Sequence, residues 1–165
     1  PRRVTTQGKQ SSEVLMVAPE VHRRDEGGAA SRTLTEVAVG IVQRSDGLYL
    51  LTTRPQGKAY AGYWEFPGGK LEAQESVVAA LRRELQEEIN ITIADAEMVR
   101  TDVVDYPHAL VRLHFCLITQ WSGEIQMREQ QTFAWSDLPT ALSPILPGTV
   151  PVLAWLATVG KVAKS

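Results

Sequence analysis

The run 75–89 constrains the fold of this chain more than any other segment, because its apolar residues recur every three or four positions. Leu81, Leu85 and Ile89 fall on one stripe at helical spacing, which predicts an amphipathic helix packed against a core. Asn90 follows the stripe and readily takes the left-handed conformation that ends a helix. The chain therefore needs an apolar surface for this helix to cover.

Segments with the alternation typical of strands lie on both sides of this helix. They cover residues 37–42, 48–53, 91–104 (extended at its start and finish), 110–121 and 132–135. The turn at 45–47 joins the first two runs in a predicted hairpin. Residues 136–139 predict a turn or a short helix, and 150–159 a closing helix. Together these elements predict an α/β fold with a mixed β-sheet between helices on both faces.

The amino-terminal part of the chain, residues 1–33, is rich in Arg, Ser, Gly, Gln and Glu and has no clear period. It predicts a flexible arm, whereas residues 34–160 form the predicted folded domain. The chain does not begin with Met, which is compatible with a piece of a longer polypeptide. With 165 residues and 44% apolar content, the chain can bury a sizeable core.

Charge and cysteine content exclude several classes of protein. A formal net charge of −2 argues against a general nucleic-acid binder, which normally carries a basic excess. No apolar run approaches the roughly 18 residues of a membrane span, and the polar start does not resemble a signal peptide. Cys116 is the only cysteine, so an internal disulfide is excluded and a reducing, cytoplasmic location is expected.

Three glutamates lie beside the apolar stripe of the predicted helix. Glu84, Glu87 and Glu88 fall within about 100° of arc, so their carboxylates repel one another. Two unit charges about 5 Å apart cost roughly 3 kcal/mol at an effective dielectric near 20. A divalent cation such as Mg²⁺ or Mn²⁺ would remove this cost, because both prefer hard oxygen ligands; a solvated acidic face is the alternative. Gly68 and Gly69 favour the ligand site, because they let the backbone approach a ligand closely.

The same segment resembles the signature of the Nudix hydrolases, which reads G-x5-E-x7-R-E-U-x-E-E-x-G-U with U an aliphatic residue. The matching residues are Gly69, Glu75, Arg83, Glu84, Leu85, Glu87, Glu88 and Ile91. Every fixed position therefore agrees except the late glycine, which is Asn90 here. A pattern of this length rarely arises by chance, so the chain is identified as a member of this family. The resemblance implies the Nudix fold, an α/β/α sandwich.

The resemblance is strongest to MutT-type enzymes, which remove damaged nucleotides, and it covers about 35–156. It includes the first strand, 37–41, the approach to the signature, 64–70, and the hairpin 121–124 with Glu129 beyond it. It implies Mg²⁺-dependent hydrolysis, with Mn²⁺ as an alternative ion, of a nucleoside triphosphate to a monophosphate and pyrophosphate. The implied substrate is 8-oxo-dGTP or a related nucleotide, with no nucleic-acid or membrane partner.

Transferred position by position, the resemblance implies a metal site. Its ligands would be the Gly68 carbonyl and the carboxylates of Glu84, Glu87, Glu88 and Glu129. A carboxylate near the metal must also accept a proton from water, and either Glu84 or Glu129 suits this role; a surface charge is the alternative for Glu129. Gly69, Glu75 and Arg83 are implied to shape the signature segment, and Arg83 can pair with a carboxylate and orient it.

Substrate contacts are implied at a second group of positions. They are Arg54, Glu65, Phe66, Pro67, Gly68 and Thr149. Arg54 matches an arginine that contacts the phosphates, with a solvated arginine as the alternative, and Phe66 suits either a nucleobase wall or the core. Thr149 stands where 8-oxo-dGTP-preferring members carry an asparagine that reads the purine, and Ala109 replaces a neighbouring arginine. The hydroxyl of Thr149 offers fewer hydrogen-bonding groups to a base than an asparagine amide, which has a donor and an acceptor together. The preference for 8-oxoguanine is therefore expected to relax or change.

Two alternatives lie within or beside this family. The same chemistry would also suit CTP or dCTP, dihydroneopterin triphosphate, or a nucleotide sugar. A non-catalytic nucleotide-sensing module is expected to lack some of the signature carboxylates, and this chain keeps Glu84, Glu87 and Glu88. No sequence pattern here specifies an oligomeric state.

Overall fold

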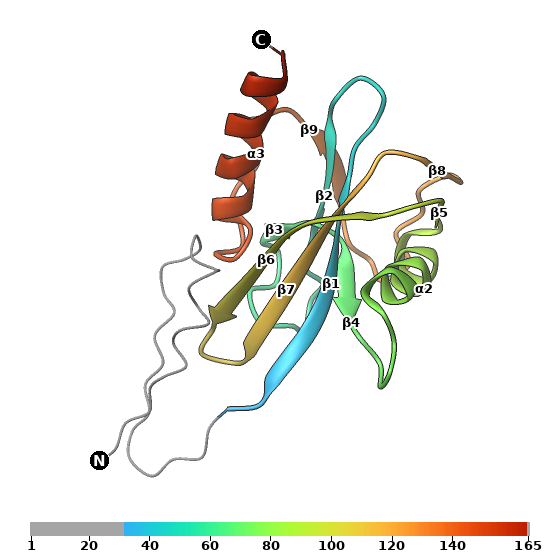
Figure 1. The fold of residues 1–165 in the computed structure, drawn as a ribbon. Coiled ribbons are helices and arrows are strands. Elements are labelled where there is room, and N and C mark those ends of the chain that lie inside the picture. The colour runs from blue at the N-terminus through green and yellow to red at the C-terminus, as the bar shows by residue number, and fades with distance from the viewer. Residues whose placement is uncertain (1–31, 165) are drawn as a thin grey trace.

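The computed structural model describes residues 32–164, with side chains through residue 160, so nearly all of the predicted arm lies outside the described residues. The elements, in chain order (Figure 1), are β1 (Leu34–Val42), β2 (Tyr49–Thr53), β3 (Trp64–Glu65), β4 (Gly68–Lys70), α2 (Val77–Ile89), β5 (Thr92–Ile93), β6 (Glu97–Asp105), β7 (Leu110–Ile118), β8 (Trp121–Ser122), β9 (Phe133–Ser136) and α3 (Val150–Lys164). At the described end of the arm, Arg32 pairs with Asp105 and donates to the carbonyl of Tyr106 at 2.7 Å. Within residues 32–164, the helices are too short or too polar to cross a membrane.

The strands form a mixed arrangement, as predicted. The main sheet has the order β4-β1-β7-β6, in which β1 and β7 are parallel and the outer pairs are antiparallel. A second, antiparallel sheet has the order β3-β2-β9, and β5 pairs with β8. Because β4 is an edge strand of the main sheet, Gly68 and Gly69 lie at the margin of that sheet.

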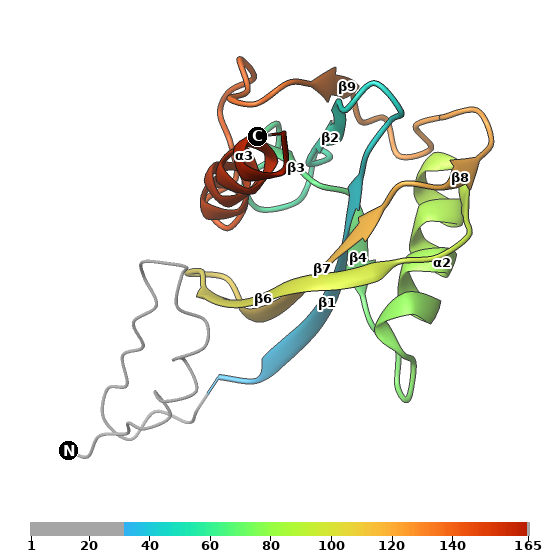
Figure 2. The ribbon, with the colours of Figure 1, turned by 45° about the horizontal axis from the view of Figure 1, so that its top comes forward.

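The two helices cover opposite faces of the main sheet (Figure 2). Leu81, Leu85 and Ile89 of α2 are fully buried in one core cluster. Val152 and Leu156 of α3 belong to the second cluster, on the other face. Burial of a leucine-sized side chain contributes about 1.5–3 kcal/mol, so packing on the sheet is the main force that holds both helices. The predicted α/β/α sandwich is confirmed.

Helix α2 begins and ends at identifiable caps. Ser76 is extended, and its hydroxyl accepts a hydrogen bond from the N–H of Ala79 at 3.1 Å. At the other end Asn90 has φ 66° and ψ 32°, the left-handed conformation predicted for it. The periodicity predicted a helix that begins at Glu75. The helix begins at Val77 instead, because Ser76 takes the cap position.

The predicted hairpin between the first two strands is present at its turn. The N–H of Gly47 donates to the Arg44 carbonyl and that of Arg44 to the Leu48 carbonyl, both at 2.9 Å, and Gln43 pairs antiparallel with Tyr49. Beyond the turn, β1 and β2 belong to different sheets. The strands separate because β1 pairs with β4 and β7, whereas β2 joins β3 and β9. The run 91–104 divides into β5 and β6, as its extended ends predicted, and residues 136–139 contain no helix.

Candidate active site

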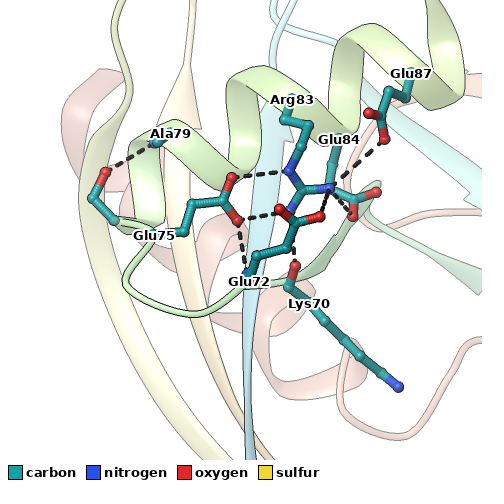
Figure 3. A network of polar contacts seen from close by, with 8 residues as sticks. Lys70, Glu72, Glu75, Ala79, Arg83, Glu84 and Glu87 are labelled. Atoms are coloured by element: carbon teal, nitrogen blue, oxygen red, sulfur yellow. Dashed lines mark hydrogen bonds and ion pairs between the residues drawn. The ribbon is translucent and has the colours of Figure 1, made fainter.

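Arg83 on α2 is the centre of a network of carboxylates at the start of the helix (Figure 3). Its Nε and Nη2 donate to the two oxygens of Glu75 at 2.9 and 2.7 Å, a bidentate pair. Nη2 also donates to the carbonyl of Lys70 at 3.1 Å, and Glu75 accepts from the backbone N–H of Glu72 at 2.8 Å. Hydrogen bonding to Arg83 lowers the pKa of Glu75 to about 2. Glu75 therefore joins the preceding loop to the helix.

The same guanidinium orients one of the three helix glutamates. Arg83 Nη1 donates to Glu84 Oε2 at 2.9 Å and lies 3.7 Å from Glu87 Oε1. The side chain of Glu84 is 15% exposed, whereas that of Glu87 is 62% exposed. The pairing of Arg83 with a carboxylate, expected from the sequence, is therefore present, and Glu84 is the glutamate held against the fold.

Gly68 and Gly69 of β4 lie where an added Cβ would meet other atoms of the protein closely. A Cβ on Gly69 would overlap the carboxyl group of Glu84, and a Cβ on Gly68 would overlap the carbonyl oxygen of Ala38. Gly68 pairs with Val39 in the antiparallel register of β4 and β1. The glycine pair therefore lets α2 and its carboxylate approach the edge of the sheet.

Glu88 is half-buried one helical turn beyond Glu84. Burial, together with the charges of Glu84, Glu129 and Glu65, raises the pKa of Glu88 to about 9. Glu129 comes from the loop after β8, where the backbone N–H of Arg128 donates to the Glu88 carbonyl at 3.1 Å. Carboxylates from α2, from β3 and from the loop after β8 thus repel one another around Glu88. The sequence predicted this repulsion only among the glutamates of the helix.

Within the described residues, no three His, Cys, Asp or Glu side chains converge closely enough to hold a metal ion as they stand. Arg83 attracts Glu84 and Glu87, and the carboxylates repel one another. The donor set nevertheless fits a hard divalent cation, because it consists of carboxylate oxygens around Glu88 whose repulsion such an ion would remove.

Comparison with known protein families shows to which family this chain belongs. The model of the NUDIX domain matches residues 34–156, which run from β1 into the first part of α3. This chain belongs to the Nudix family. Nudix hydrolases generally require a divalent metal ion, in agreement with the carboxylates around Glu88.

Curated relatives of this Nudix chain include two kinds of nucleotide hydrolase. It is 38% identical over 106 residues to an 8-oxo-dGTP diphosphatase of Haemophilus influenzae, covering 64% of the chain and 78% of that enzyme. It is 36% identical over 121 residues to a CTP pyrophosphohydrolase of Escherichia coli, covering 73% of the chain and 89% of that enzyme.

Solved structures support the same assignment. A structure from a study of MutT of Aliivibrio salmonicida and Vibrio cholerae aligns with a TM-score of 0.66 and 32% identity, covering 77% of the chain and 99% of that protein. The solution structure of the E. coli ORF135 protein aligns with a TM-score of 0.66 and 32% identity, covering 78% of this chain and 91% of that protein. The chain is a MutT-type Nudix hydrolase, which confirms the predicted fold and enzyme class and does not favour a non-catalytic module.

Arg54, the predicted phosphate contact of this Nudix hydrolase, lies directly after β2. Its Nη1 pairs with Glu65 Oε1 at 3.1 Å, and its Nε donates to the carbonyl of Ala59 at 2.7 Å. Burial raises the pKa of Glu65, and the charge of Arg54 opposes that shift. The side chain of Arg54 is 19% exposed, so it is held between β3 and the loop 54–63 and is not a freely solvated arginine.

Three other predicted substrate contacts of the Nudix hydrolase are buried. Phe66 is 3% exposed and packs edge to face on Phe115, with ring centroids 6.5 Å apart, so the structure favours the core among its two predicted roles. The carbonyl of Pro67 accepts from the N–H of Gly40 at 2.8 Å. Thr149 is 4% exposed, and its carbonyl accepts from the N–H groups of Val152 and Leu153 in the first turn of α3. In this conformation the Thr149 hydroxyl therefore offers little surface to a base.

Periodicity does not predict an aromatic cluster that forms near Arg54 from Tyr60, Tyr106 and His108. Tyr106 stacks on His108 with ring centroids 5.1 Å apart, and Tyr60 lies 5.5 and 5.8 Å from these two rings. The Tyr106 hydroxyl accepts from the N–H of Gly148 at 2.8 Å, and burial raises its pKa to about 12. These residues come from a loop and from the turn between β6 and β7, so only their aromatic character marks them in the sequence.

Without metal, the free energy of unfolding of the Nudix hydrolase is expected to fall as pH rises between about 4.5 and 9. The pKa of Glu88 is raised from 4.5 to about 9 in the folded protein, so in this window the folded chain keeps a proton that the unfolded chain has released. Glu88→Gln has no such proton to lose. In EDTA, this variant should melt at a higher temperature than the wild type at pH 8 and at the same temperature at pH 4. An equal difference in Tm at both pH values would contradict this expectation.

Proposed function

We propose that this Nudix hydrolase uses Mg²⁺ to cleave a nucleoside triphosphate into a nucleoside monophosphate and pyrophosphate, and so removes damaged nucleotides such as 8-oxo-dGTP. The observation that carries the proposal is the gathering of carboxylates around Glu88, which raises its pKa to about 9 beside the glycine-bearing edge of the sheet. A cation would stabilise such a cluster at neutral pH. The names of the relatives supply the substrate class.

Mg²⁺ would be held by oxygen atoms of Gly68, Glu84, Glu87, Glu88 and Glu129, and Mn²⁺ suits the same donors. When bound, the ion would neutralise charge on the phosphate oxygens and activate water. Arg83 donates to Glu84 at 2.9 Å and so orients one of these carboxylates. Glu84 or Glu129 would accept the proton of the attacking water, because each presents a carboxylate to the same cluster.

Arg54 would supply positive charge to the phosphate chain. Its guanidinium is directed by the pair with Glu65 at 3.1 Å and by the bond to the Ala59 carbonyl at 2.7 Å. A guanidinium in a fixed orientation can bind two phosphate oxygens at once, which a flexible surface lysine cannot do. This arrangement supports a role for Arg54 in substrate binding.

A pyrimidine nucleotide is the second candidate substrate. Thr149 occupies the position of the purine-reading asparagine and is only 4% exposed. Ala109, in the turn between β6 and β7, has no side-chain group that can form a hydrogen bond with a base. In addition, the E. coli relative that is 36% identical, with 89% of its length covered, is named a CTP pyrophosphohydrolase. These observations favour a site that does not select 8-oxoguanine through those two positions.

A panel of nucleoside triphosphates with Mg²⁺ tests the reaction and separates the two candidates. We expect release of pyrophosphate and not of orthophosphate from 8-oxo-dGTP, dGTP, CTP and dCTP. The kcat/KM for 8-oxo-dGTP should exceed that for dGTP by no more than about 10²-fold, because the amide that would enforce a ratio of roughly 10⁴ is missing at Thr149. A larger ratio would show that another residue reads the base, and orthophosphate as the product would contradict the proposed reaction.

A further inference from the structure

Asn90 stands where the Nudix signature has a glycine, and its side chain makes contacts that a glycine cannot make. It ends α2 in the left-handed conformation, with φ 66°. Its Oδ1 accepts from Arg128 Nη2 at 2.7 Å, and its Nδ2 donates to the carbonyl of Glu124 at 3.0 Å. The backbone conformation expected of a glycine is thus kept, and two hydrogen bonds to a distant loop are added.

Backbone contacts also attach the loop 123–132 to the carboxyl end of α2. The N–H of Gln126 donates to the Ile89 carbonyl and that of Arg128 to the Glu88 carbonyl, both at 3.1 Å. The carbonyl of Gln86 in α2 also accepts a hydrogen bond from Arg128 Nη1 at 3.2 Å. The last turn of a helix leaves its carbonyls without partners in the helix, so this loop acts as an extended cap for α2.

Glu129 directly follows Arg128, so its position depends on where this loop is held. The charge of Glu129 acts on Glu88, and Glu84 adds a third negative charge to the same cluster. Because these carboxylates repel one another, the loop needs attachments that do not depend on a bound cation. Asn90 provides two of them, one at each end of the segment that leads to Glu129.

We propose that Asn90 is a positioning residue that seats Glu129 in the active site, and that the metal requirement and turnover of this enzyme depend on it. In this role Asn90 acts through Arg128 and the loop and does not contact the substrate. The inference rests on the proposed role of Glu129 in catalysis and deepens it. A glycine at this position ends the helix, whereas asparagine ends the helix and also holds the loop.

Asn90→Gly restores the residue of the signature and removes both side-chain hydrogen bonds to the loop, together with a longer one from Gln86 Nε2 at 3.4 Å within the helix. Glycine prefers the left-handed cap, so Tm should not fall. We expect kcat to decrease about tenfold and the Mg²⁺ concentration for half-maximal rate to rise about tenfold, with little change in KM for the nucleotide. Asn90→Asp keeps the acceptor for Arg128 and should recover most of the rate. Unchanged kinetics in Asn90→Gly, or an equal loss in Asn90→Asp, would overturn the proposal.

Glu129→Gln distinguishes a positioning role from a general structural one. If Asn90 acts through Glu129, Asn90→Gly should cause no further loss of kcat in a Glu129→Gln background. Fully multiplicative losses in the double variant would overturn this inference alone, because Asn90 would then act elsewhere. Wild-type kinetics of Glu129→Gln by itself would refute the proposed role of Glu129 and the inference together.

Gln74→Gly is a matched control for the exchange at Asn90. Gln74 is also a non-glycine residue in the left-handed region, with φ 65°, and it lies exposed before the start of α2. The same replacement there should leave kcat and the Mg²⁺ requirement unchanged. A tenfold loss in Gln74→Gly would show that glycine near the ends of α2 disturbs the enzyme whatever contacts are removed, and would overturn the interpretation of Asn90→Gly.

Discussion

Glu88→Gln is expected to lower kcat by about 10²- to 10⁴-fold while the protein stays folded. The substitution removes one negative charge from the cluster of Glu84, Glu88 and Glu129 and nearly preserves the shape of the side chain. Fewer charged oxygens would then be left to hold the proposed cation, which would neutralise charge on the substrate phosphates. Glu87→Gln is expected to act in the same direction, although the carboxylate of Glu87 is 62% exposed, because it projects from the same turn of α2.

Steady-state rates of pyrophosphate release with Mg²⁺ test both glutamine variants. Glu97→Gln replaces an exposed glutamate at the start of β6 and should keep the wild-type kcat. Far-UV circular dichroism checks that each variant is folded. Rates like those of the wild type in both Glu87→Gln and Glu88→Gln would refute the assignment of these carboxylates to the metal.

Gly68→Ala is expected to lower the free energy of unfolding by about 3 kcal/mol or more. The new Cβ would overlap the carbonyl oxygen of Ala38 and lie 2.9 Å from Val39 Cα, and relief would disturb the pairing of β1 with β4. Gly69→Ala differs, since its Cβ would meet the flexible carboxyl end of Glu84, which can rotate away. This second variant is expected to stay folded and to lose turnover, because it displaces Glu84.

Chemical denaturation and kinetics together separate these two effects. Gly47→Ala is the control for backbone strain alone, because Gly47 has φ 92° and an added Cβ would meet no atom within 4 Å; it should cost about 1–2 kcal/mol. Equal losses of stability in Gly68→Ala and Gly47→Ala would contradict the overlap with β1. Full activity of Gly69→Ala would contradict the proposed role of Glu84.

Helix α2 shows how far periodicity predicts this fold. The spacing of Leu81, Leu85 and Ile89 predicts the helix because buried side chains on a helix must share one face. The predicted first residue, Glu75, was wrong because the hydroxyl of Ser76, and not the apolar stripe, determines where the first turn begins. The predicted hairpin is present at its turn but does not continue along the two strands. A turn between two strands does not decide their partners, and β1 pairs along its whole length with β7.

The signature predicts which residues of one segment gather, but not how each is held. Arg83 was expected to orient a carboxylate, and the structure adds that it binds Glu75 through two hydrogen bonds and Glu84 through one. The burial of Thr149 could not be predicted, because it depends on the packing of the start of α3 and not on any local pattern. The aromatic cluster of Tyr60, Tyr106 and His108 likewise combines a loop with a turn far along the chain.

The sequence by itself determined the family, the amphipathic helix and the carboxylates of that helix, because these depend on residue types at fixed spacings within one segment. The resemblance implied that Glu129 joins the helix glutamates, with a surface charge as the alternative, and the tertiary structure favours the first because the charge of Glu129 acts on Glu88. Only the tertiary structure decided that Asn90 holds the loop between them. Those contacts join residues more than thirty positions apart. They form because the end of α2 leaves unpaired carbonyls beside a repulsive carboxylate cluster, and the loop after β8 supplies the donors.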